Sequence, residues 1–193
     1  MMDVSLDLNR RYTYADYLTW LDDRRRELID GMVRLMSPAP RLSHQRICAN
    51  LLINIGAKLR ETGCGCSIFA APFDVRLPKN GEKEDEKIYT VVQPDICVVC
   101  DLTKLDERGC LGAPDLIIEI QSPSSAKYDL NTKFNLYEAA GVREYWVAPQ
   151  TAGYILKFVL QSDGKYDEGT VYEKGKIGST VLEGLEIDLN DIF

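Results

Sequence analysis

The sequence predicts an α+β protein with a mixed central β-sheet flanked by helices and additional antiparallel strands towards both ends of the chain. Two observations favour this class. Residues 96–100 and 116–121 are apolar at consecutive positions, which is typical of strands covered on both faces. Between residues 43 and 60 apolar side chains recur every four positions, which is typical of a helix packed on a core. Because 193 residues contain neither a repeat nor a linker-like segment, we expect a single domain over residues 1–193.

The N-terminal elements follow from cap and turn signals. Thr13 and Asp16 have the spacing of a capping box and predict a helix of about two turns. Asp30–Gly31 is a strong turn signal between two apolar runs, so residues 27–36 are predicted to form a β-hairpin. The proline-rich residues 37–40 then end the sheet segment.

The middle of the chain is read from its periodicity. The helix over residues 43–60 should end at Gly63, because glycine is the usual residue after a helix. Residues 68–77 alternate between apolar and polar and predict one strand. Residues 78–87 are too polar to be buried and predict a mobile loop before the first fully apolar strand.

The C-terminal third continues the sheet. Ser124 or Ser125 can cap a helix that runs to residue 140 and ends at Gly141. Residues 142–147 predict a further buried strand. Short strands are then expected over 154–160, 165–172 and 180–187.

Composition and charge restrict the class of protein. With 45% apolar and 27% charged residues, the chain has the balance of a globular protein, which excludes a disordered or collagen-like one. No apolar run approaches the ~20 residues of a membrane helix, and residues 1–12 are too charged for a signal-peptide core. We therefore expect a cytoplasmic protein with no membrane partner. The net charge of −7 argues against a broad basic surface for nucleic acid, but is compatible with a small acidic site that holds a divalent cation.

The six cysteines raise the question of a zinc site or disulfides. The spacings of Cys64 with Cys66 and of Cys97 with Cys100 resemble the two halves of a zinc site. Residues three apart on a strand point to opposite faces, however, so Cys97 and Cys100 cannot ligate one ion. We expect apolar buried thiols, with zinc as the lesser alternative, and the expected cytoplasmic setting disfavours disulfides.

Glu119 is the residue that most needs an explanation. It stands within an otherwise apolar strand, where an unpaired buried carboxylate is costly. A divalent cation shared with Asp95 would compensate for it, since Mg²⁺ in proteins is commonly held by one or two carboxylates together with waters and substrate phosphate. Lys133, on the next helix, could reach the same place and orient a water or neutralise a phosphate.

A purely structural interpretation is equally open from spacing alone. Glu119 and Lys133 could form a buried ion pair between strand and helix, and Asp95 could only begin its strand. Glu27 could be a third acidic member of the site or an exposed carboxylate at a sheet edge. His44, the single histidine, is more often a cap or surface residue in such a position than a catalytic base.

An ordered series of short motifs covers residues 12–150. Its members are YTYADYL at 12–18, ELIDG at 27–31, SP at 37–38 with His44, PD at 94–95, PDLIIEI at 114–120, SPS at 122–124, Asp129, Lys133 and Tyr137, and EAAGVREYWV at 138–147. In this order they resemble the Uma2 or DUF820 family of the PD-(D/E)XK nuclease superfamily. The resemblance implies a restriction endonuclease-like core with Asp95 and Glu119 as metal ligands.

The chain departs from the superfamily pattern at Gln121, where that pattern has a lysine two residues after the acid. The resemblance implies that Lys133 on the following helix takes this place, and that Glu27 belongs to the site. We therefore expect a Mg²⁺- or Mn²⁺-dependent endonuclease acting on nucleic acid, with DNA as the expected substrate. Asp95 and Glu119 would hold the metal, Lys133 would position the water, Gln121 would hydrogen-bond it, and Glu27 would complete the acidic cluster.

We expect these groups to converge in one solvated cleft. The alternative is a catalytically inactive nuclease-fold module that binds nucleic acid or a protein partner, or a structural ion-pair core.

Arg24 to Arg26 are the candidates for a local basic patch. A homodimer is expected as one way to protect the edges of the C-terminal strands.

Overall fold

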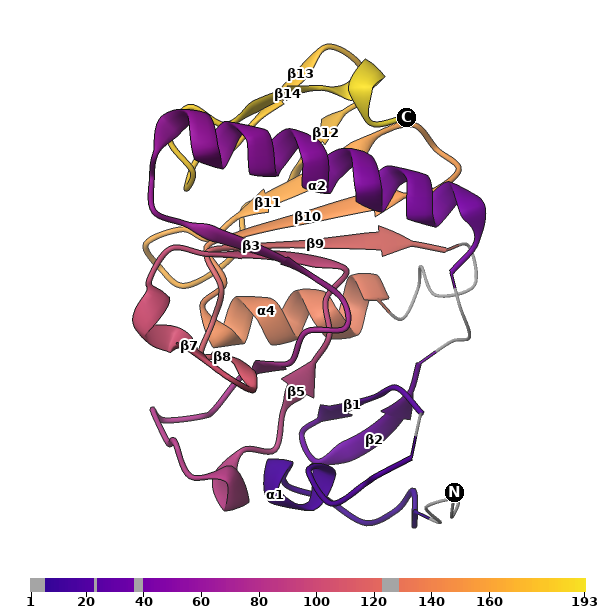
Figure 1. The fold of residues 1–193 in the computed structure, drawn as a ribbon, viewed down its shortest axis with the longest axis vertical. Coiled ribbons are helices and arrows are strands. Elements are labelled where there is room, and N and C mark those ends of the chain that lie inside the picture. The colour runs from indigo at the N-terminus through magenta and orange to yellow at the C-terminus, as the bar shows by residue number, and fades with distance from the viewer. Residues whose placement is uncertain (1–5, 23, 37–39, 123–128) are drawn as a thin grey trace.

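The computed structural model describes residues 6–22, 24–36, 40–122 and 129–193. Its centre is a six-stranded sheet in the order β12-β11-β10-β9-β6-β3 (Figure 1). β9 and β10 run parallel, whereas the other neighbouring strands run antiparallel. The predicted mixed sheet is thus confirmed. The strands are β3 (Ser67–Ala70), β6 (Ile96–Val99), β9 (Leu116–Gln121), β10 (Glu144–Pro149), β11 (Ile155–Val159) and β12 (Thr170–Tyr172).

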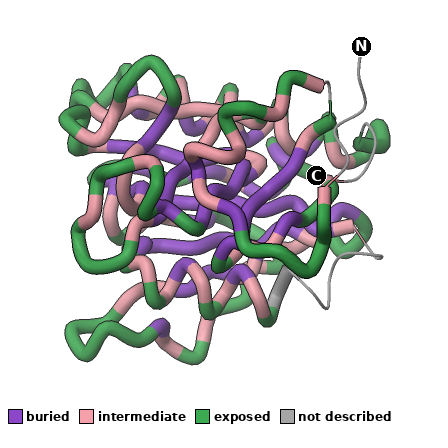
Figure 2. Tube along the Cα trace, turned by 90° about the horizontal axis from the view of Figure 1, so that it is seen from below, coloured by how far each residue is buried: buried purple, intermediate pink, exposed green. Residues whose placement is uncertain are grey.

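Two helices cover the opposite faces of this sheet, α2 (Leu42–Thr62) and α4 (Phe134–Ala140) (Figure 1). The strands β6 and β9 are buried at every position, as their apolar runs predict, and Figure 2 shows the buried strands at the centre. Alternate residues face different helices because side chains alternate along a strand. The core on the α2 face includes Ile47, Leu51, Ile96, Ile118 and Ile120. The core on the α4 face includes Cys97, Ile117, Tyr137, Tyr145 and Val147.

A second six-stranded sheet, in the order β2-β1-β5-β4-β8-β7, lies on the α4 side of the central sheet (Figure 1). The predicted hairpin is confirmed, with Asp30 and Gly31 at φ 51° and 84° in its turn. Helix α1 (Tyr14–Tyr17) begins at the predicted capping box of Thr13 and Asp16, but it has one turn rather than two. The strands are β1 (Arg26–Ile29), β2 (Met32–Leu35), β4 (Val75–Arg76), β5 (Val91–Val92), β7 (Leu105–Asp106) and β8 (Gly109–Leu111).

The remaining elements are short. The polar loop contains the 3₁₀ turn η1 (Asp85–Lys87), and η2 (Leu102–Lys104) precedes β7. The C-terminal hairpin β13 (Lys176–Gly178) and β14 (Glu186–Asp188) packs beside α2 and is followed by η4 (Leu189–Asp191). Residues 180–185 turn rather than extend, so the strand predicted over 180–187 is wrong except at its end.

Two further boundaries differ from the sequence prediction. Residues 68–77 form two strands in different sheets, β3 and β4, separated by the segment that contains Pro72. The helix before Gly141 has a π-helical turn, η3 (Asp129–Lys133), ahead of α4. The caps expected at Ser124 or Ser125 and most of the proline segment at 37–40 lie outside the described residues.

The cysteine prediction needs a correction. Cys66 and Cys100 form a disulfide, with their Cα atoms 4.0 Å apart. The register of β3 and β6 explains the pairing, since Ser67 lies opposite Val99 and the next pair along is Cys66 and Cys100. Of the other cysteines, Cys97 and Cys110 are buried thiols as expected, whereas Cys64 is exposed and Cys48 is half-buried.

Within the described ranges, no helix has both the length and the apolar character needed to cross a membrane.

Candidate active site

Glu119 enters the site from the middle of β9. It points to the α4 face of the sheet, and its side chain is 8% exposed. The register pairs Ile96 of β6 with Ile118 of β9, so Asp95 lies opposite Glu119 at the next position. The sheet therefore brings together two of the carboxylates that the sequence singles out.

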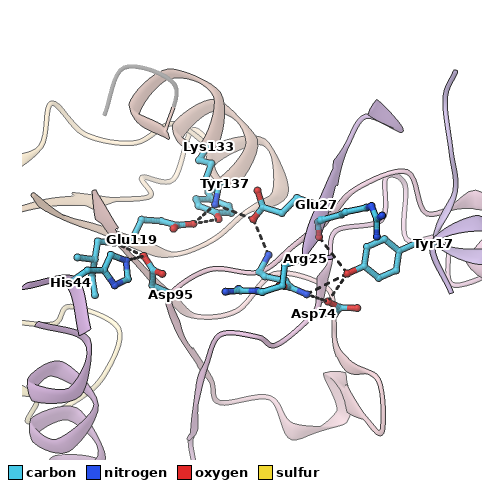
Figure 3. A network of polar contacts seen from close by, with 12 residues as sticks. Tyr17, Arg25, Glu27, His44, Asp74, Asp95, Glu119, Lys133 and Tyr137 are labelled. Atoms are coloured by element: carbon cyan, nitrogen blue, oxygen red, sulfur yellow. Dashed lines mark hydrogen bonds and ion pairs between the residues drawn. The ribbon is translucent and has the colours of Figure 1, made fainter. Parts of the chain in front are cut away.

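Lys133 and Tyr137 contact Glu119 from the helical segment that covers this face of the sheet, and they lie one helical turn apart (Figure 3). Lys133 Nζ lies 2.8 Å from Glu119 Oε1, and the hydroxyl of Tyr137 donates to the same oxygen at 2.6 Å. Both side chains are buried. The buried ion pair that sequence spacing leaves open is thus present, with a phenol hydroxyl added to it.

Glu27 reaches the same lysine from β1 of the second sheet. Its Oε1 lies 3.0 Å from Lys133 Nζ and also accepts a hydrogen bond from the backbone N–H of Gln93 at 3.0 Å. Glu27 is buried, so the exposed-edge alternative is wrong. Lys133 consequently bridges a carboxylate from each of the two large sheets (Figure 3).

Asp95 occupies the other end of the cluster, at the start of β6. Its Oδ2 accepts a hydrogen bond from the backbone N–H of Ile120 at 2.7 Å and lies 3.3 Å from His44 Nε2. Burial lowers the pKa of His44, but the hydrogen bond and charge of Asp95 raise it more, so the net shift is upward. His44 therefore lies at the site, on the first turn of α2, rather than on an open surface.

The cluster has an excess of negative charge. Among the described residues, the ammonium group of Lys133 contacts two carboxylates, Glu27 and Glu119, and a third, Asp95, lies beside Glu119 and contacts His44. The three carboxylates and Lys133 have a net charge of −2 when all four are ionised and His44 is neutral. Burial raises the pKa of Glu119 to about 7; the charge of Lys133 opposes this shift, and the charges of Asp95 and Glu27 add to it. An added cation would reduce this repulsion between the carboxylates.

The arrangement suits a divalent cation held partly by the protein. Asp95 Oδ1 and Glu119 Oε2 accept no hydrogen bond from a described residue, and neither is a fully enclosed atom. No group of three or more His, Cys, Asp or Glu side chains forms a ready metal cage in the part of the chain that the structure describes. Two carboxylate oxygens with water and substrate phosphate fit this pattern for Mg²⁺ or Mn²⁺.

Gln121 lies two residues beyond Glu119 on the same face of β9. It is buried, and its Nε2 has no hydrogen-bond partner in the described structure. A buried amide donor without a partner is unusual and is commonly satisfied by water or a ligand. The predicted role of Gln121 towards a water needs such an unpartnered donor on this face, and in this conformation the atom is enclosed.

The site is more closed than the sequence predicts. The side chains of Glu119 and Lys133 are 8% and 6% exposed, while that of Asp95 is 20% exposed. The expected open cleft around all three groups is wrong for this conformation, because the ion pair fills the space between strand and helix. Access is therefore greatest at Asp95.

Sequence reasoning missed Tyr137 as a polar member of the site and assigned no role to Gln93. The motif match includes Tyr137, but its spacing on the helix face reads equally as core packing. The proposed basic patch also needs correction, since Arg26 is buried and paired with Asp22 at 2.5 Å. The side chain of Asp129 lies outside what the structure describes.

A mixed sheet between two helices, with carboxylates converging at neighbouring strands, defines an α+β protein with an acidic site on its central sheet. The chain belongs to the Uma2 family, described as "Putative restriction endonuclease", whose model matches residues 14–190. A solved structure of similar fold is a "putative nuclease belonging to DUF820" from Anabaena variabilis ATCC 29413. It is 17% identical with a TM-score of 0.70, over 94% of this chain and 97% of that one. No match is found among curated proteins.

Proposed function

We propose that this protein is a divalent-metal-dependent nuclease that hydrolyses phosphodiester bonds in nucleic acid, with DNA as its substrate. The observation that supports the proposal is the group of three carboxylates, two of them in contact with Lys133 and the third, Asp95, beside Glu119. This group has an excess of negative charge and, among the described residues, keeps one oxygen free on Asp95 and on Glu119. Membership of a family described as putative restriction endonucleases supports the same reaction class.

Asp95 and Glu119 would hold Mg²⁺ or Mn²⁺ through their free oxygens. Such an ion supplies Lewis-acid stabilisation of the phosphate and lowers the pKa of a bound water. Glu119 has to be ionised to act as a ligand, and the ammonium of Lys133 favours its ionised form.

The other side chains have positioning roles. Lys133 presents a charged donor close to the metal ligands, where it can orient the attacking water and offset charge on the phosphate. Gln121 offers the second donor to that water through its unpartnered Nε2. Tyr137 and Glu27 would hold Glu119 and Lys133 in place, because Tyr137 donates to Glu119 at 2.6 Å and Glu27 accepts from Lys133 at 3.0 Å.

A second candidate is an inactive nuclease-fold module that binds nucleic acid or a protein partner. Two observations favour it: Gln121 stands where the superfamily has its lysine, and the ion pair of Glu119 with Lys133 is closed and buried. Cleavage separates the two candidates, since a module binds without hydrolysing.

The test is cleavage of supercoiled plasmid DNA and of labelled RNA by purified protein with Mg²⁺, with Mn²⁺ and with EDTA. We expect metal-dependent cleavage of DNA that Glu119→Gln and Lys133→Met each reduce by at least ~100-fold, the scale of losing one preorganised charged group. Because Lys133→Met leaves two buried carboxylates without their cation, its folding is checked by circular dichroism, and Lys133→Arg provides a variant that keeps the charge.

The exposed pair of Lys176 and Glu186, 2.7 Å apart on the C-terminal hairpin, provides matched controls. Lys176→Met and Glu186→Gln change the same residue types and should cleave like the wild type. Cleavage that survives Glu119→Gln would overturn the assignment of the site. Folded wild type without cleavage under any metal would favour the inactive module.

A further inference from the structure

Arg25 has the least compensated guanidinium near the candidate site. It directly precedes β1, and its backbone carbonyl accepts a hydrogen bond from Met36 N–H at 3.1 Å, which fixes it beside the hairpin. Its side chain is half-buried and donates from Nε to Gln93 Oε1 at 3.0 Å. That single bond goes to a neutral amide, so it does not balance the charge of the arginine.

The rest of the guanidinium has no protein partner among the described residues. No carboxylate of a described residue lies within ion-pair distance of Arg25. Its Nη2 is enclosed without a hydrogen bond, and Nη1 makes none to the described residues although it is not enclosed. Arginine stays charged under all ordinary conditions, and charged groups enclosed in a protein are normally paired. The neighbouring Arg26 shows the usual solution, since its guanidinium pairs with Asp22. Arg25 thus lacks an anion.

The position of Arg25 relates it to the candidate active site. Gln93, which accepts from Arg25, also donates its backbone N–H to Glu27 and its side-chain Nε2 to Asp74 at 2.9 Å. Two residues further along the same segment lies Asp95. Figure 3 shows Arg25 within this network, beside the group formed by Glu27 and Lys133.

We infer that Arg25 binds a backbone phosphate of the nucleic acid, adjacent to the phosphate that is hydrolysed. The inference rests on the proposed function, since it takes nucleic acid as the substrate. A guanidinium presents a planar fork of donors that matches two phosphate oxygens, and it is less strongly hydrated than an ammonium group. A chain with a net charge of −7 also needs local cationic contacts to hold a polyanion. The role is binding and register, distinct from the hydrolytic step.

The test measures binding to fluorescein-labelled DNA by anisotropy, with Ca²⁺ in place of Mg²⁺, between about 50 and about 200 mM salt. Arg25→Gln should weaken binding about eightfold at ~0.1 M salt and lower the slope of log affinity against log salt by about 0.7 to 0.9, the effect of one lost phosphate contact. Arg60→Gln is the matched control, because Arg60 is an exposed residue in the last turn of α2, and it should leave both quantities unchanged.

A second measurement identifies the phosphate. DNA carrying one neutral methylphosphonate is scanned along the strand, and one position should weaken binding to the wild type without weakening binding to Arg25→Gln further, because coupled partners are not additive. Equal affinity and slope for Arg25→Gln and wild type would overturn the inference, and so would additive effects at every position or a wild type that does not bind DNA. If binding depends on Arg25 while no metal supports cleavage, the phosphate contact of Arg25 stands and the proposed hydrolysis fails.

Discussion

Lys133 is shared between two buried carboxylates, and this sharing sets the energetics of the candidate site. Removing a partner from a buried charge network leaves an uncompensated charge that costs about 3–5 kcal/mol, more than an exposed pair contributes. The apolar run around Glu119 predicts such a need for compensation, and it points to Asp95 and Lys133. It does not point to Tyr137, because the ring of a tyrosine packs in a core in the same periodic position as a phenylalanine while its hydroxyl can still reach a polar partner.

The raised pKa of Glu119 predicts a pH dependence of stability in the metal-free protein. The folded state holds a proton at Glu119 up to a pKa of about 7, whereas the unfolded value is about 4.5, so the folded state binds more protons between these values. The contribution of Glu119 to the free energy of unfolding therefore falls as pH rises through that window. Glu119→Gln should abolish this part of the dependence.

The measurement is urea denaturation in EDTA at a series of pH values on both sides of the window. Glu186→Gln serves as the control, because Glu186 is exposed and far from the cluster in the C-terminal hairpin. Parallel pH profiles for the wild type and Glu119→Gln would show that Glu119 titrates normally in the folded protein.

At the scale of elements, local signals predict local structure well. The hairpin turn at Asp30–Gly31, the stripe of α2 and the apolar runs of β6 and β9 each specify their element without reference to the rest of the chain. The prediction of one strand over residues 68–77 is wrong because the two halves of this segment pair with strands in different sheets. Such pairing depends on residues far away in the sequence. The disulfide between Cys66 and Cys100 is not predicted from the sequence for the same reason, since it depends on a strand register that sequence spacing does not reveal.

The disulfide predicts a measurable stabilisation of the sheet edge formed by β3. It closes a loop with a sequence separation of 34, for which chain entropy gives about 4 kcal/mol. Cys66→Ser should lower the free energy of unfolding by about this amount, whereas Cys64→Ser, at an exposed free thiol, should leave it unchanged. Titration of the denatured, unreduced protein should find four reactive thiols. Finding six, or equal stability for both variants, would contradict the pairing.

At the scale of the whole molecule, the site exists because two sheets meet around α4. The central sheet contributes Asp95 and Glu119, the second sheet contributes Glu27, and the helical segment between β9 and β10 contributes Lys133. Strand alternation predicts which face Glu119 takes, but no sequence pattern places the hairpin against that face. Reasoning from the residues therefore leaves the place of Glu27 open, and the family resemblance favours the site. The homodimer stays a prediction.

The structure locates part of the net charge of −7 at the candidate site. Part of the excess lies in Glu27 and Glu119, which share the ammonium group of Lys133, and in the neighbouring Asp95. A divalent cation there removes a repulsion within the protein and also lowers its repulsion of a polyanion. If the proposed metal site is correct, we expect metal binding to strengthen the binding of nucleic acid.

The central claim is that Asp95 and Glu119 form a divalent metal site, and calorimetric titration of the purified protein with Mn²⁺ tests it most directly. We predict saturable binding above neutral pH that is lost in Asp95→Asn and in Glu119→Gln but kept in Glu186→Gln, each variant being checked for native folding. A folded wild type that binds no Mn²⁺, or Glu119→Gln that binds it with unchanged affinity, would contradict the account.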